Sequence, residues 1–116
     1  MNRANLMDAL KAQGADIDGV MERFLRDEAL YVDCFEEFML DENFKALGKA
    51  IMVQDHSQAF EYAHALKGVA GNLGLLPLYR AANNIVSALR AKEYDTLDTL
   101  YQTVVAGRDL FASLLL

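Results

Sequence analysis

A histidine, a lysine and two glycines stand at helical spacing in the segment 55–74. At about 100° per residue, Lys67, Gly68 and Gly71 all lie within about 60° of His64 on one face of the predicted helix. The glycines leave this face without side chains, so another molecule can approach the imidazole closely, while Lys67 places a cation one turn away. A neutral imidazole is a competent nucleophile near pH 7. Together these residues favour a site at which His64 accepts an anionic group.

The opposite face of the same helix is apolar, so we expect His64 to be exposed to solvent. The expected core face consists of Tyr62, Leu66, Val69, Leu73, Ala59 and Ala70. Phe60 and Leu75 fall on the side of His64, where we expect an apolar rim on which a partner docks. A glycine within a helix costs about 1 kcal/mol relative to alanine, so two on one exposed face indicate a functional reason.

The elements that position this segment are also predicted to be helices. Apolar residues recur three and four positions apart along the chain, and no strand pattern bounded by turn residues occurs. We expect a first helix over about 3–13 and a second that starts near residue 17, where Asp16 is placed to cap it. Helical structure then continues to 53, and three further helices cover about 55–73, 77–92 and 96–115. Either Asp27 or Asp41 is placed to start or interrupt the stretch 28–53, which the sequence leaves open as one bent helix or two.

Local signals mark the ends of the histidine-bearing helix. Asp55 with Gln58 three residues later resembles a capping box, Gly74 is placed to end the helix, and Pro77 suits the first turn of the next. Connections of about two to five residues make the last three long helices antiparallel neighbours. The expected fold is all-α: an antiparallel up-and-down four-helix bundle with an additional short N-terminal helix. We expect a single domain over residues 1–116.

The composition excludes several classes of protein. The chain has 116 residues, 53% of them hydrophobic, which is enough for one packed core without disulfides. Its formal net charge of −6 opposes binding to nucleic acid or anionic lipid. The apolar run 110–116 is too short to span a bilayer, and the single cysteine, Cys34, has no partner for an internal disulfide. We expect a cytoplasmic protein that binds neither nucleic acid nor membrane.

The run 63–74, AHALKGVAGNLG, resembles the signature of histidine-containing phosphotransfer (HPt) domains, in which His-x-Leu-Lys-Gly is followed by Asn-Leu-Gly. The resemblance covers about residues 20–115. It implies that His64 takes a phosphoryl group from the aspartyl phosphate of one receiver domain and passes it to the aspartate of another. It further implies that Lys67 stabilises the phosphoryl group and that Gly68 leaves room for it. The remaining motif positions, with a structural role, are Leu66, Asn72, Leu73 and Gly74.

The resemblance also implies the partners. Response-regulator receiver domains, with a hybrid sensor histidine kinase as a further candidate, would supply the Mg²⁺ ion and most of the catalytic groups. We expect no intrinsic cofactor, and no glycine-rich loop for ATP occurs in the sequence, so the chain is expected to be a transfer intermediate and not an enzyme.

Two alternatives compete with this interpretation. The first is a helical adaptor that binds a signalling partner without being phosphorylated, in which His64 is only a contact. The second is a carboxylate-bridged metal site, because Glu61 precedes His64 by three residues. Such a site needs a second Glu-x-x-His pair facing the bundle interior, and the sequence has none. We therefore expect no metal site.

Overall fold

The computed structural model describes residues 2–116, and within this range the chain forms seven helices and no strand. In chain order they are α1 (Arg3–Ala12), α2 (Ile17–Arg23), α3 (Glu28–Met39), α4 (Asn43–Met52), α5 (His56–Asn72), α6 (Leu76–Arg90) and α7 (Leu97–Ser113). The predicted all-α class is confirmed.

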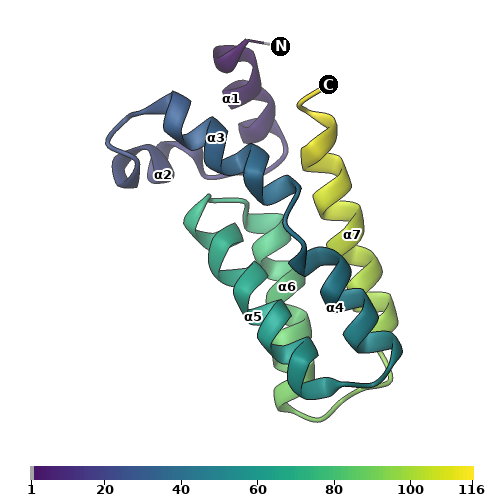
Figure 1. The fold of residues 1–116 in the computed structure, drawn as a ribbon. Coiled ribbons are helices and arrows are strands. Elements are labelled where there is room, and N and C mark those ends of the chain that lie inside the picture. Colours follow the sequence, from purple (N-terminus) through teal and green to yellow (C-terminus); the bar gives the residue numbers. More distant parts are fainter. Residues whose placement is uncertain (1) are drawn as a thin grey trace.

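Helices α4, α5, α6 and α7 run side by side in alternating directions as an elongated bundle (Figure 1). Helix α5 packs between α4 and α6, and α7 closes the bundle against α4 and α6. The expected four-helix bundle and the short N-terminal helix, α1, are both present. Helices α2 and α3 join α1 in a layer at one end of the bundle, and the molecule measures 41 × 26 × 21 Å.

Aspartate caps start three of the helices where the sequence places them. The side chains of Asp16, Asp27 and Asp55 each accept a hydrogen bond from the backbone N–H three residues later, at 3.2, 3.0 and 3.2 Å. The stretch 28–53 is two helices, because Asp27 caps α3 while the carboxylate of Asp41 bonds the first N–H of α4 at 2.8 Å. These side chains satisfy N–H groups that the helix itself leaves without a partner.

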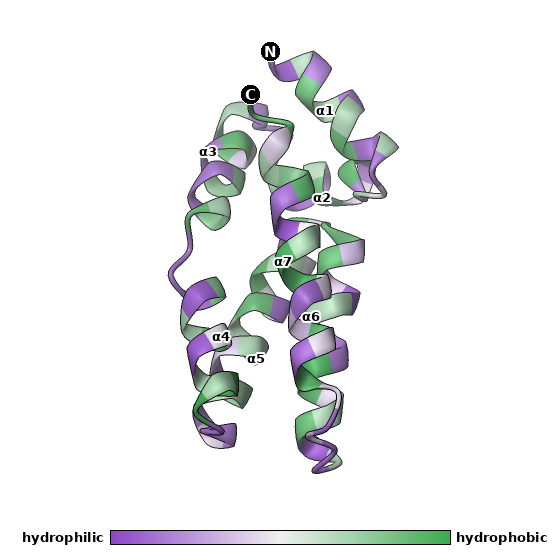
Figure 2. Cartoon of the chain, turned by 90° about the vertical axis from the view of Figure 1, so that its right-hand side faces the viewer, coloured by the Kyte–Doolittle hydropathy of each residue, from purple (hydrophilic) through white to green (hydrophobic). Residues whose placement is uncertain are grey.

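The core is one continuous apolar cluster that links the layer to the bundle. Its largest fully buried side chains include Tyr31 and Phe35 of α3, Leu66 of α5 and Phe111 of α7. Each bundle helix carries both hydrophobic and hydrophilic residues around its circumference (Figure 2). The hydrophobic sides supply the buried cluster, which leaves the polar sides of the helices for solvent or partners.

The buried face of α5 lies about 40° away from the face that the spacing predicts. It is formed by Ala59, Ala63, Leu66 and Ala70, whereas Val69 is 38% exposed and Tyr62 is half-buried. The expectation that Val69 belongs to the core is therefore wrong. Three of the four buried residues are alanines, whose small side chains allow neighbouring helices to pack closely, and Val69 lies outside this face.

Over the described part of the chain, no helix has both the length and the apolar character that a membrane span requires.

Candidate functional site

His64 lies near the middle of α5 and is exposed, as the spacing predicts. The ring of Phe60, one turn earlier, is nearly parallel to the imidazole, with 5.8 Å between ring centroids and 12° between planes. The guanidinium carbon of Arg90 lies 5.3 Å from the centre of the same phenyl ring. The imidazole therefore has an aromatic neighbour toward the start of α5 and is open to solvent elsewhere.

A shallow pocket of about 350 Å³ opens beside His64. It is lined by His64, Lys67, Gly68, Gly71 and Asn72 of α5, by Arg23 of α2 and by Tyr79 of α6. The structure thus brings together four residues that the helical spacing placed on one face. It adds two from other helices, Arg23 and Tyr79, which sequence reasoning missed because nothing local marks a contact between residues far apart in the chain.

The two glycines of this face have different surroundings. A Cβ atom at Gly68 would meet nothing within 4 Å, so the helix surface next to His64 is open. A Cβ atom at Gly71 would lie 3.1 Å from Cδ2 of Tyr79. The open space expected at both glycines is therefore present at Gly68, while at Gly71 the ring of Tyr79 fills much of it.

Lys67 supplies a positive charge that forms no ion pair with a carboxylate of the described residues. Its Nζ atom lies 5.9 Å from the centre of the Tyr79 ring, within the range of a cation–π contact. None of the ion pairs in residues 2–116 involves this lysine. The ammonium group is thus held near the pocket and remains available to an anion.

The C-terminal end of α5 is held by the N-terminal layer. Nη2 of Arg23 donates to the carbonyl oxygens of Gly71 and Asn72, at 3.2 and 3.0 Å. The hydroxyl of Tyr31 donates to the carbonyl of Leu73 at 2.7 Å. Burial raises the pKa of Tyr31 well above its usual value, an effect that the positive charge of Arg23 opposes. These bonds satisfy carbonyl groups that a helix end leaves free.

Gly74 turns the chain out of α5, and its φ of +72° is the left-handed conformation that glycine favours. Its carbonyl accepts a hydrogen bond from the N–H of Asp16 at 2.8 Å. Pro77 follows in the first turn of α6, as predicted. Because α5 ends before Gly74, the helical spacing of α5 does not extend to the residues that follow.

The position of Leu75 differs from the one predicted for it. The expectation that Leu75 belongs to an exposed docking rim is wrong, because its side chain is completely buried. It is the N-cap residue of α6, and the turn at Gly74 directs it into the core. Phe60 is half-buried, so the apolar part of this face consists of Phe60 without Leu75.

Nothing in the described residues resembles a metal centre, since no three His, Cys, Asp or Glu side chains cluster closely enough to hold an ion.

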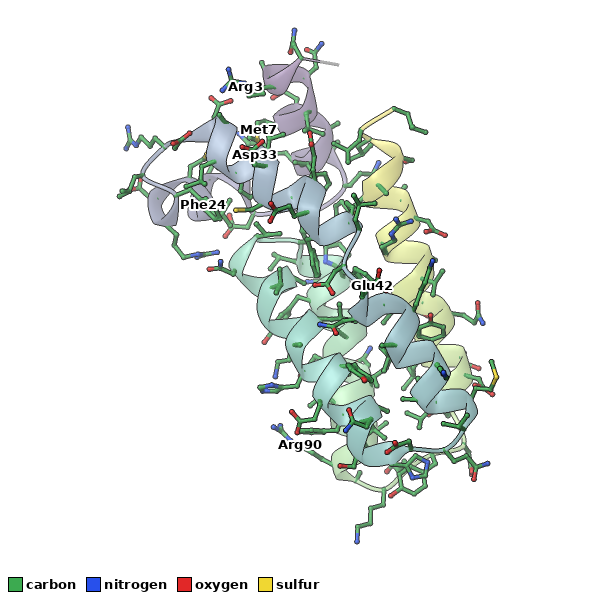
Figure 3. The ribbon with its side chains drawn as sticks, viewed as in Figure 1. Arg3, Met7, Phe24, Asp33, Glu42 and Arg90 are labelled. Atoms are coloured by element: carbon green, nitrogen blue, oxygen red, sulfur yellow. The ribbon has the colours of Figure 1, made fainter. Side chains whose placement is uncertain are left out.

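The second histidine, His56, lies at the start of α5 and stacks on Tyr94, with 3.7 Å between ring centroids. Figure 3 shows Arg90 near this end of α5, and Phe24, which follows Arg23 in the chain, near the opposite end. His56 does not line the pocket beside His64.

Comparison with known families gives one match. A family model, described as the Hpt domain, matches residues 31–108, roughly two thirds of the chain. The match includes the whole of α5 and α6 but not α1, α2 or Arg23. Neither the curated proteins nor the solved structures contain a significant match to this sequence.

Proposed function

The chain belongs to the Hpt domain family, and we propose that it carries a phosphoryl group between receiver domains on His64. Hpt domains perform histidine phosphotransfer in two-component phosphorelays, in which they act as carriers and interact with receiver domains and kinases. The observation that carries the assignment to His64 is its position: an exposed imidazole beside the open surface at Gly68 and the unpaired ammonium of Lys67.

In this reaction the chain itself needs to supply only a positioned imidazole and a nearby positive charge. The unprotonated imidazole nitrogen attacks the phosphorus of an aspartyl phosphate in line, the N–P bond forms, and the O–P bond to the receiver's carboxylate breaks. Lys67 offsets charge on the phosphoryl oxygens, and Gly68 leaves space for the group and for the approaching receiver. Transfer to a second receiver reverses these bond changes, with its aspartate carboxylate as the nucleophile.

The partners complete the site. We propose response-regulator receiver domains as donor and acceptor, with a hybrid sensor kinase as a source of the donor domain, and the receiver as the holder of Mg²⁺. We place the protein in the cytoplasm with these partners. We also propose that residues 1–116 act as one domain, because Arg23, Tyr31 and Asp16 of the N-terminal layer all bond the end of α5.

The proposal is tested by mixing the protein with a receiver domain that carries labelled aspartyl phosphate. Wild type and His56→Gln should gain acid-labile, base-stable label, and His64→Gln should gain none. Label on His64→Gln equal to that on wild type would overturn the site assignment. If no variant is phosphorylated and His64→Ala binds the receiver as tightly as wild type does, the protein is an adaptor instead.

A further inference from the structure

The environment of the pocket beside His64 poses an electrostatic problem for a phosphoryl group. A phosphoryl group carries a charge of about −1.5 to −2 near neutral pH. The last carbonyl groups of a helix carry partial negative charge, and the carbonyls of Gly71 and Asn72 lie at the end of α5 that borders this pocket. Lys67 brings only one positive charge. A second cation would therefore favour the phosphorylated state.

Arg23 brings a second cation to the end of this pocket that the last turn of α5 forms. It lines the same pocket as His64, and one of its nitrogens, Nη2, already bonds the carbonyls of Gly71 and Asn72. Its charge thereby offsets the negative end of α5. Over residues 2–116, Arg23 forms no ion pair and its guanidinium makes no other hydrogen bond.

We propose that Arg23, supplied by α2 from outside the region that matches the family, is a second cation of this site and stabilises the phosphoryl group on His64 through its charge. The two bonds to α5 hold the guanidinium at the carbonyls of Gly71 and Asn72, at least about 10 Å along the helix from His64, so it acts across the pocket and not by direct contact. The N-terminal layer thus takes part in the site as well as packing on the bundle.

This inference rests on the proposed function, so its test uses a donor that needs no partner protein. Phosphoramidate phosphorylates an exposed histidine: an imidazole nitrogen displaces ammonia, the N–P bond to imidazole forms, and the original N–P bond breaks. All variants carry His56→Gln, so that His64 is the only histidine to be labelled. The test variants are Arg23→Gln and Arg23→Lys. The control is Arg26→Gln, which removes the same charge from an exposed arginine that pairs with Glu22 at 3.2 Å and does not line the pocket.

Phosphorus-31 NMR follows the phosphoryl group as the pH is varied. If the charge of Arg23 acts on it, Arg23→Gln should raise the titration midpoint of the phosphoryl group by about 0.3–0.5 pH unit, because a lost cation disfavours the dianion. The rate of phosphorylation should fall about twofold to threefold, because the same charge no longer stabilises the negatively charged transition state. Arg23→Lys should keep the midpoint near that of the parent, and Arg26→Gln should match the parent in both measurements.

A midpoint and rate for folded Arg23→Gln equal to those of Arg26→Gln would show that Arg23 only fastens α2 to α5. Circular dichroism confirms folding of each variant. If Arg23→Gln does not fold, the inference is tested by NMR of the parent protein. Phosphorylation should move the ¹⁵N–¹H resonance of the Arg23 side chain and leave that of Arg26 in place. An unmoved Arg23 resonance overturns the inference. If neither phosphoramidate nor a phosphorylated receiver labels His64 in the parent, the proposed function itself fails.

Discussion

Gly68 and Gly71 belong to the same motif and the same helix, yet their surroundings give them different roles. Gly68 has open space where a side chain would be, whereas Gly71 accommodates the ring of Tyr79 from α6. A glycine in a helix costs about 1 kcal/mol relative to alanine. At Gly71 close packing of α6 compensates for that cost. At Gly68 no contact within residues 2–116 does, so the reason for this glycine lies in what approaches the helix.

Replacing Gly68 by alanine separates stability from function. We expect Gly68→Ala to raise the free energy of unfolding by up to about 1 kcal/mol and to slow phosphoryl transfer from a receiver, because the methyl group occupies the approach to His64. Urea unfolding and transfer kinetics measure the two effects. Gly71→Ala is the matched control, in which contact with Tyr79 should cancel most of the gain in stability. A Gly68→Ala protein that transfers as fast as wild type would remove Gly68 from the site.

A second prediction concerns the unpaired ammonium group of Lys67. Lys67→Ala should slow transfer from a phosphorylated receiver by about tenfold, equivalent to about 1.4 kcal/mol of transition-state stabilisation, and leave the thermal unfolding midpoint nearly unchanged. Lys49→Ala, which removes an exposed lysine from α4 outside this pocket, is the control. Equal transfer rates for the two variants would exclude Lys67 from the mechanism.

Among the elements, α5 depends on groups from another part of the chain. Four successive carbonyl groups, from Gly71 to Gly74, accept hydrogen bonds from residues of α2, α3 and the turn before α2. Both the positive φ of Gly74 and its narrow surroundings are needed for this arrangement, since a Cβ atom there would lie 2.5 Å from Val20 and 2.9 Å from the carbonyl oxygen of Asp16. The end of the motif helix and the N-terminal layer are thus built together.

Gly74→Ala should therefore destabilise the protein by at least about 1–3 kcal/mol, the cost of a left-handed conformation in a residue with a side chain. Chemical denaturation monitored by circular dichroism measures this loss. Gly107→Ala is the control, because a Cβ atom in the middle of α7 would meet Leu78 only at an ordinary 3.4 Å. A loss for Gly74→Ala no larger than that for Gly107→Ala would contradict this account of the turn.

Sequence reasoning succeeded at this scale where the signal is local and failed where it is not. The caps at Asp16 and Asp55 and the turn at Gly74 involve residues within one helical turn, so their types and spacing were sufficient. Leu75 was misplaced because helical angles were extended past the end of the helix. Arg23 was missed because its bonds span 48 and 49 residues, a distance over which spacing carries no information.

At the scale of the whole molecule, polar side chains fasten helices to one another at their ends. The hydroxyl of Tyr31 in α3 bonds the carbonyl of Leu73, and the hydroxyl of Tyr101 in α7 bonds the carbonyl of Phe44 at 2.9 Å. Burial raises the pKa of Tyr101 as well, and the nearby charge of Asp109 adds to this effect. The layer and the bundle therefore depend on tyrosine hydroxyls that keep their protons.

This dependence predicts how stability responds to alkali. Because the pKa of Tyr31 is higher in the folded protein than the value of about 10 in the unfolded chain, its contribution is fully present below pH 10 and is lost as the pH rises above it. We expect a loss of about 1.4 kcal/mol per pH unit from this residue. Tyr31→Phe should be about 1–3 kcal/mol less stable than wild type at pH 8, since the buried carbonyl of Leu73 loses its donor.

Above pH 10 the two proteins should therefore converge, because phenylalanine has no proton to lose. Urea unfolding at half-unit steps from pH 8 to about pH 11.5 measures both curves. Tyr94→Phe, at an exposed position, should follow wild type throughout. Parallel curves for wild type and Tyr31→Phe would show that the hydroxyl of Tyr31 can ionise within the folded protein. The bond to Leu73 would then not be what joins the N-terminal layer to the motif helix.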